Sequence, residues 1–72
     1  MKYVLTRNSN PVLLFQSSRI PTQEDIENYI RQEYSNDFTL VSYNCIKGWT
    51  YRFNKSGMEH LFNITKVPYK NL

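Results

Sequence analysis

The chain has 72 residues, of which 40% are hydrophobic, and its formal net charge is +3, so it fits a single folded domain with a small core (residues 1–72) and not a disordered segment. A single cysteine and a single histidine exclude an internal disulfide and a zinc site with four nitrogen or sulfur ligands. The longest apolar run, residues 12–15, is too short to cross a bilayer, and we expect a soluble, cytoplasmic protein without a metal or a cofactor.

The N-terminal part of the chain predicts a β-hairpin. Residues 3–6 (YVLT) are β-branched, aromatic or aliphatic, residues 8–11 (NSNP) are typical of a turn, and residues 12–16 (VLLFQ) suit a second strand. The apolar run in the second strand is uninterrupted. We therefore expect this strand to be covered on both faces or to lie at the centre of the sheet.

The next segment predicts an amphipathic helix over about residues 22–35. Thr22 is a good N-cap, and Asp25 stands three residues later, where a capping box has its acid. Apolar side chains then recur at helical spacing on one face: Ile26, Tyr29, Ile30 and Tyr34. A helix with a single apolar face must pack against another element.

The remainder predicts three strands joined by short turns. Residues 38–45 alternate in polarity, residues 47–48 and 54–57 form turns, and strands occupy residues 49–53 and about 59–67. The order is ββαβββ, and each connection after the helix is short enough for an antiparallel hairpin. We predict an α+β fold with an antiparallel sheet of four or five strands and one helix on one face. Residues 68–72 form a tail that is a candidate flexible segment.

The stretch KGWTYRF, residues 47–53, has two interpretations. Because side chains alternate along a strand, Trp49, Tyr51 and Phe53 share one face, and we expect these rings to pack beneath the helix. Alternatively, the stretch partly matches the exposed aromatic strand of RNA-binding sheets, whose rings stack on bases. Asn54 stands where that pattern needs an aromatic residue, and the chain is short for such a fold.

No combination of residues predicts catalysis. His60 has no second histidine and no carboxylate placed beside it by a motif, and Cys45 is most simply a small hydrophobic residue at a strand end. Two isolated glycines cannot form a phosphate-binding loop. We therefore do not expect an enzyme.

Charge is unevenly distributed along the chain. Residues 24–37 hold five of the six acids and one base, whereas the rest of the chain holds eight bases and one acid. Together with the short chain, the lack of a catalytic set and the many aromatic residues, this pattern suggests a small non-catalytic protein that binds a larger protein and regulates or inhibits it. The alternative is a nucleic-acid-binding protein with a basic and aromatic sheet surface. Neither reading includes a membrane or a small-molecule substrate.

Six residues are the candidates for partner binding. Arg52 and Tyr43 are expected on the sheet face opposite the helix, depending on the register, and an exposed edge strand offers a second way to bind. The full set is Arg52, Lys47, Tyr43, Lys55, Lys66 and Tyr69. Eight asparagines beside many lysines, isoleucines and tyrosines indicate an AT-rich genome, and a stand-alone domain this short suits a phage or mobile element.

Overall fold

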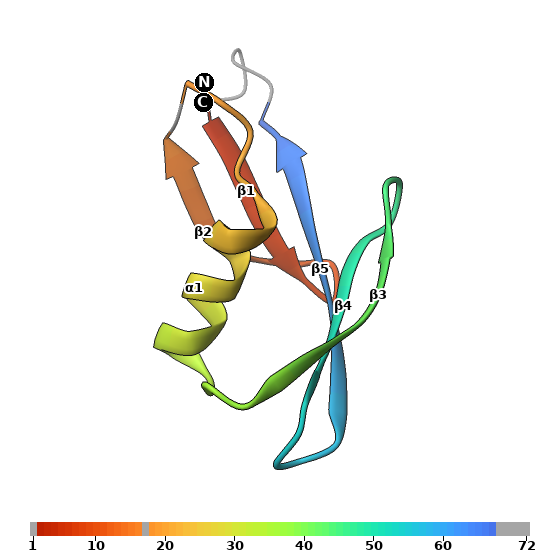
Figure 1. Cartoon of the computed structure of the whole chain (residues 1–72). Helices are drawn as coiled ribbons and strands as arrows, with labels where there is room; N and C mark the ends of the chain where they lie inside the picture. Colours follow the sequence, from red (N-terminus) through yellow and green to blue (C-terminus); the bar gives the residue numbers. More distant parts are fainter. Residues whose placement is uncertain (1, 17, 68–72) are drawn as a thin grey trace.

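The computed structural model describes residues 2–16 and 18–67, which form five strands and one helix. The elements are β1 (Lys2–Arg7), β2 (Asn10–Gln16), α1 (Gln23–Glu33), β3 (Phe38–Asn44), β4 (Gly48–Phe53) and β5 (Met58–Lys66). All neighbouring strands are antiparallel, in the order β2-β1-β5-β4-β3, and α1 lies across one face (Figure 1). The predicted α+β class and ββαβββ order are confirmed. The tail, residues 68–72, lies outside the described residues.

A tight turn joins β1 to β2. Asn8 and Ser9 both have positive φ, 51° and 72°, which is the conformation of the two central residues of a type I′ turn. Arg7 then pairs directly with Asn10. The hairpin was predicted, but its turn is shorter than expected, because residues 10 and 11 already belong to β2.

The expectation that β2 is covered on both faces or central is wrong, because β2 is an edge strand. Leu13 and Phe15 pack against the core on the helix side, whereas Leu14 between them is 49% exposed. Only one face of this apolar run is therefore covered. Strand order depends on the pairing of β1 with β5, some 60 residues apart, and no local pattern contains that information.

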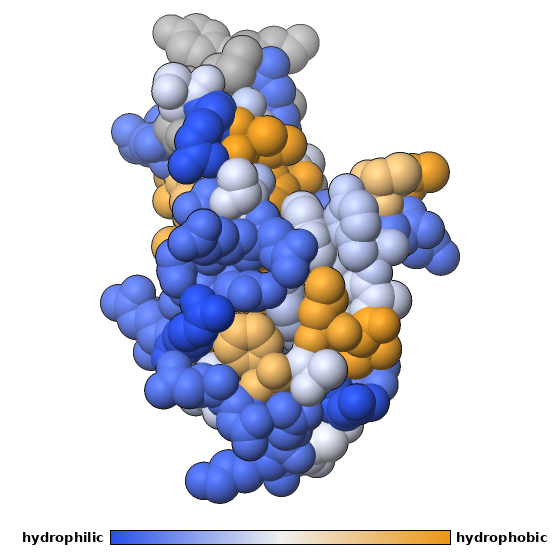
Figure 2. Space-filling view, viewed as in Figure 1, coloured by the Kyte–Doolittle hydropathy of each residue, from blue (hydrophilic) through white to orange (hydrophobic). Residues whose placement is uncertain are grey.

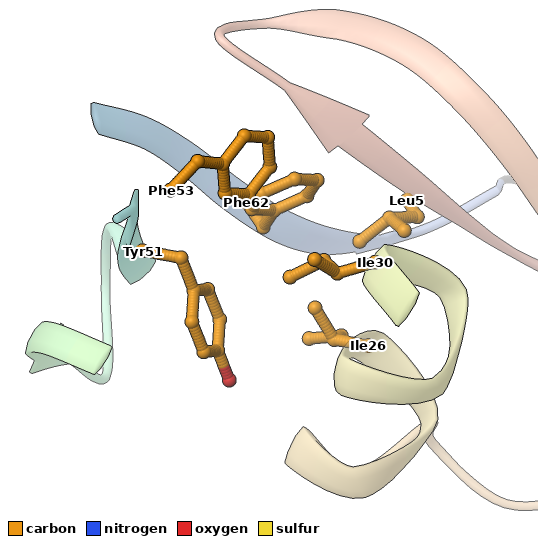
Figure 3. Close-up of a cluster of buried hydrophobic side chains, with 6 residues drawn as sticks. All are labelled: Leu5, Ile26, Ile30, Tyr51, Phe53 and Phe62. Carbon is orange, nitrogen blue, oxygen red and sulfur yellow. The ribbon is translucent and has the colours of Figure 1, made fainter. Parts of the chain in front are cut away.

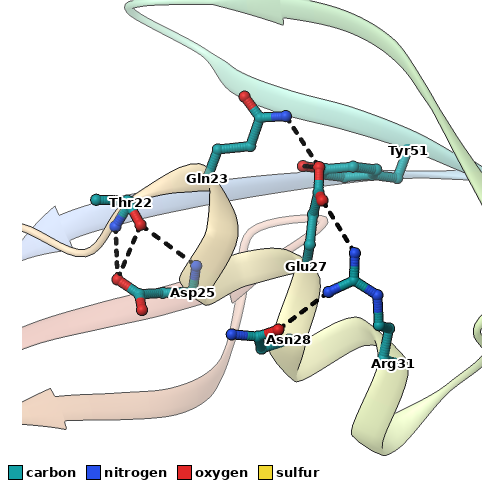
Figure 4. A network of polar contacts seen from close by, with 7 residues as sticks. All are labelled: Thr22, Gln23, Asp25, Glu27, Asn28, Arg31 and Tyr51. Carbon is teal, nitrogen blue, oxygen red and sulfur yellow. Dashed lines mark hydrogen bonds and ion pairs between the residues drawn. The ribbon is translucent and has the colours of Figure 1, made fainter.

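The N-terminus of α1 is fixed by the predicted capping box (Figure 4). The Asp25 N–H donates to Thr22 Oγ1 at 3.4 Å, and the Thr22 N–H donates to Asp25 Oδ2 at 2.8 Å. Two backbone donors that the helix cannot satisfy itself thus find partners. The helix ends at Glu33, where the Tyr34 N–H still donates to the Ile30 carbonyl at 2.8 Å.

The core lies between α1 and the sheet (Figure 3). Its buried side chains are Leu5, Ile26, Ile30, Tyr51, Phe53 and Phe62. The predicted position of the β4 rings beneath the helix is confirmed for Tyr51 and Phe53, while Trp49 is half-buried at the border of the cluster. Burial of each large side chain stabilises the fold by about 1.5–3 kcal/mol.

A polar network joins the flank of α1 to β4 (Figure 4). The Tyr51 hydroxyl donates to Glu27 Oε2 at 3.0 Å, and this carboxylate also accepts from Gln23 at 2.9 Å and from Arg31 at 3.3 Å. Burial and the hydrogen bond to Glu27 raise the pKa of Tyr51 well above its ordinary value of 10. The phenol therefore stays protonated and fixes the helix against the sheet.

Candidate functional site

Exposed apolar side chains gather on β3 and in the turn after it. Eight large hydrophobic side chains of the described residues are exposed, and half of them lie in this segment. These four are Leu40 (37% exposed), Val41 (41%), Tyr43 (56%) and Ile46 (82%). Figure 2 shows apolar surface along β3 and at the tip of the β3–β4 hairpin. Clustered apolar surface of this kind is typical of an interaction site, whereas isolated exposed residues are not.

A β-bulge in β3 determines the direction of these side chains. The pairing with β4 skips one residue between Leu40 and Ser42, so Val41 is the extra residue. After the bulge, Tyr43 lies opposite Trp49 and shares its sheet face. Their ring centroids are 5.0 Å apart at an interplanar angle of 32°. The bulge thus places the Tyr43 and Trp49 rings side by side, at the end of the sheet that the helix does not cover.

The turn after β3 brings an exposed aliphatic side chain next to a cation. Asn44 Oδ1 accepts from the backbone N–H groups of Ile46 at 2.8 Å and of Lys47 at 3.2 Å, which closes the turn. Ile46 therefore projects at the hairpin tip, beside the exposed Lys47 and the exposed Cys45. Cys45 is not the strand residue that the sequence predicts, because β3 ends at Asn44.

The two edges of the sheet differ in their ability to accept another strand. β2 contains Pro11, which lacks an N–H, whereas an irregular pairing is common to both edges, near Thr6 for β2 and at Val41 for β3. β3 (FTLVSYN) has neither proline nor a charged residue, which are common means of preventing edge pairing. We define the β3 edge as Leu40, Val41, Tyr43 and Ile46 with the free backbone of β3.

Two of the six predicted binding residues, Tyr43 and Lys47, lie together at this edge. Arg52 lies elsewhere, because it alternates with the buried Tyr51 and therefore points to the open face of the sheet. There it forms a 3.9 Å ion pair with the exposed Glu59. Arg52 and Tyr43, which were expected on one surface, thus lie on opposite faces because of the bulge.

The other predicted residues lie away from the end of β3 that holds Tyr43. Lys55 lies in the β4–β5 turn, at the end of β4 opposite to Lys47. Lys66 is near the end of β5, beside Tyr3 of β1, and Tyr69 lies outside the described residues. The six candidates therefore do not form one surface.

Sequence reasoning missed Leu40, Val41 and Ile46 as candidate interface residues. Strand order makes them exposed, and the sequence does not give that order. The sequence held one local signal of an exposed apolar strand. Residues 38–46 contain no charged residue, in a chain of which 21% of the residues are charged.

His60 is a buried histidine within an aromatic cluster. Its exposed fraction is 6%, and its ring stacks on Phe53 with centroids 4.5 Å apart. Asn8 Nδ2 lies 3.5 Å from His60 Nδ1, and burial lowers the pKa of His60 below its ordinary value of 6.5. The ring is therefore part of the packing between these aromatic side chains, with little of its surface open to solvent.

Comparisons with protein-family models, curated proteins and solved structures give no match to this chain. Over residues 2–16 and 18–67, no set of three or more His, Cys, Asp or Glu side chains is placed to hold a metal ion. The one helix of this region is too short and too polar to span a membrane. Among the described residues, the β3 edge stands out by its clustered exposed apolar side chains.

Proposed function

We propose that this chain is a non-catalytic binding protein that regulates or inhibits a larger protein by adding its β3 edge to a sheet of that partner. The observation that supports the proposal is the uncharged edge strand with exposed Leu40, Val41 and Tyr43. In strand addition, main-chain hydrogen bonds supply affinity and alternating side chains supply specificity.

The residues of the β3 edge suit this mode of binding. Tyr43 combines a large contact area with a hydroxyl, and tyrosine is enriched among the residues that dominate interface energies. The Trp49 ring packs beside Tyr43 and already restricts its side-chain conformations. Tyr43 therefore loses less conformational entropy on binding. A partner whose own edge strand is occupied in this way cannot pair that edge with anything else, which gives a physical basis for inhibition.

Nucleic-acid binding, the alternative, has less support. Tyr51 and Phe53 are in the core, where they cannot stack on bases. The cations Lys47, Lys55 and Arg52 lie at the two ends of β4 and on the open face, which is unlike a continuous phosphate-binding groove. We therefore treat nucleic acid as an outcome of the test.

The test is affinity capture from a lysate of the encoding organism, with and without nuclease, using three forms of the chain. Val41→Lys introduces a charge at the β3 edge, and Leu14→Lys introduces the same charge at an exposed apolar position on the opposite edge strand. We expect one protein to be retained by the wild type and by Leu14→Lys, with and without nuclease. Its recovery should fall at least tenfold with Val41→Lys.

Three results would contradict the proposal. Capture that survives Val41→Lys would remove the β3 edge from the interface, and capture that disappears with nuclease would point to nucleic acid. A dimer in sedimentation velocity that Val41→Lys dissociates, without any captured protein, would put a second copy of the chain on the edge.

A further inference from the structure

A groove runs between α1 and β2, on the opposite side of the molecule from the β3 edge. It has a volume of about 340 Å³, and all of its described lining residues belong to these two elements. The lining residues are Leu13 and Phe15 of β2 and Asp25, Asn28, Tyr29, Gln32 and Glu33 of α1. The helical residues follow the spacing i, i+3, i+4, i+7, i+8, so they form one stripe next to the buried Ile26 and Ile30.

The groove exists because β2 is an edge strand beneath the margin of the helix. Leu13, Phe15 and Tyr29 pack against the core but remain only partly buried, and they form an apolar floor. The Tyr29 hydroxyl shares a hydrogen bond with that of Tyr34, and burial is the main cause that raises its pKa to about 12. Tyr29 is therefore a neutral, oriented ring in the floor of the groove.

The charge of the groove is negative, although the chain as a whole is positive. Asp25 and Glu33 line it, and none of its lining residues within 2–16 and 18–67 is a lysine or an arginine. Asp25 is already engaged in the capping box and in a 3.8 Å ion pair with Arg19. Glu33 has no ion pair within residues 2–16 and 18–67.

The position of Glu33 strengthens its attraction for a cation. Glu33 is the last residue of α1, where the helix dipole places partial negative charge. The cation of the last turn, Arg31, is turned to the other flank, where it bonds Glu27 and lies 5.4 Å from the centre of the Phe38 ring. On the side of α1 that faces β2, Glu33 therefore keeps a carboxylate without an ion pair among the described residues. The Arg7 cation near this end of the helix lies 5.3 Å from the centre of the Tyr34 ring, and its charge also acts on Tyr29.

We propose that this groove binds an arginine next to an aliphatic residue in a segment of a partner protein. The guanidinium would bond the Glu33 carboxylate and stack on Tyr29, and the aliphatic side chain would cover Leu13 and Phe15. Arginine fits better than lysine, because a planar guanidinium both pairs with a carboxylate in two places and stacks on an aromatic ring. The volume is at the lower limit for ligand sites, so it suits one or two side chains and not a folded element.

The experiment is an NMR titration of the ¹⁵N-labelled chain with the blocked peptide acetyl-Gly-Arg-Leu-Gly-amide, and with the same peptide carrying Glu in place of Arg. We expect saturable shifts of the amides of Leu13, Phe15, Tyr29 and Glu33 with the arginine peptide, without shifts along β3. Binding should weaken at least fivefold with Glu33→Gln. Glu24→Gln is the control, because Glu24 is an exposed acid of the same helix that does not line the groove, and it should leave the affinity unchanged.

Four results would overturn the inference. The first is the absence of saturable shifts at millimolar arginine peptide. The second is that the glutamate peptide binds as tightly as the arginine peptide, and the third is that Glu33→Gln binds the arginine peptide as tightly as the wild type. The fourth is equal affinity for methylguanidinium alone, which would assign the groove to small cations and not to a protein segment. The β3 edge takes no part in this titration, so its outcome is independent of the proposed function.

Discussion

At the scale of single residues, His60 is held neutral by its surroundings. The groups that face it are the cation of Arg7 and the amide of Asn8, with the rings of Tyr34, Phe53 and Phe62. The Arg7 guanidinium itself lies 5.3 Å from the centre of the Tyr34 ring. Burial and, to a lesser degree, this cation both oppose protonation, and no carboxylate of the described part of the chain is among the causes that shift this pKa.

Stability should therefore fall as the pH decreases below about 6.5. The folded state keeps the neutral ring to a lower pH than the unfolded state, so the unfolded chain binds the extra proton. Urea unfolding at steps from pH 7.5 to 5.5 measures the effect, and His60→Gln is the comparison because the chain has no other histidine. A wild type whose free energy of unfolding is constant over this range, or a variant with the same slope, would refute the assignment.

At the scale of elements, Gly48 sets how closely β4 and β5 approach. It has a φ of +103°, and a Cβ at this position would collide with the carbonyl oxygen of Phe62 in β5. Gly57 in the β4–β5 turn also has positive φ, +72°, but a Cβ there would meet no atom within 4 Å. The two glycines thus share the backbone strain that a side chain would cause and differ in the space around them.

We expect Gly57→Ala to lower the free energy of unfolding by about 1 kcal/mol, which is the cost of a left-handed conformation. Gly48→Ala should cost more than about 3 kcal/mol, because the collision with the β5 backbone is added to that strain. Urea unfolding followed by circular dichroism measures both values. Equal losses for the two variants, or soluble Gly48→Ala with wild-type stability, would show that β4 and β5 are not so closely packed.

Local elements were predictable from sequence because their causes are local. Thr22 and Asp25 fix the helix start through contacts three residues apart, and the alternation of Tyr51 and Phe53 assigns both rings to one face. The hairpin turn at Asn8 is likewise a property of a few neighbouring residues.

Features that depend on distant pairing were not predictable. The edge position of β2 and of β3 follows from the pairing of β1 with β5. The face of Tyr43 depends on the bulge at Val41, which the alternating pattern of residues 38–45 conceals. For the same reason, the candidate interface shares only Tyr43 with the six residues proposed from sequence, and Lys47 lies beside it in the β3–β4 turn.

At the scale of the whole molecule, the helix covers only part of the sheet. The radius of gyration is 12.4 Å, somewhat more than the value of about 11 Å expected for a compact chain of this length. Figure 1 shows the reason, since the far half of β3 and the adjoining part of β4 extend away from α1. The molecule thus exposes Tyr43 beside the half-buried Trp49, while its core lies at the other end of β4.

This extension should not unfold separately from the rest. β4 carries both Trp49 and the core residues Tyr51 and Phe53, and β5 pairs with it along its length. We expect the fluorescence of Trp49, the only tryptophan, to report the same urea midpoint and slope as circular dichroism at 222 nm. A fluorescence transition at lower urea would instead show that the β3–β4 end melts as an independent unit.

The position of Cys45 affects how any association of this chain must be studied. It is the only cysteine, and its thiol is exposed in the β3–β4 turn beside Ile46. Air oxidation can link two chains through a disulfide at this thiol and hold their hairpin tips together. Such a covalent dimer can be mistaken for association by strand pairing, but dithiothreitol reduces it to monomers. The same thiol offers a single attachment point for a maleimide-borne photoreactive group, which would label the protein bound at the neighbouring edge without altering any residue that contacts it.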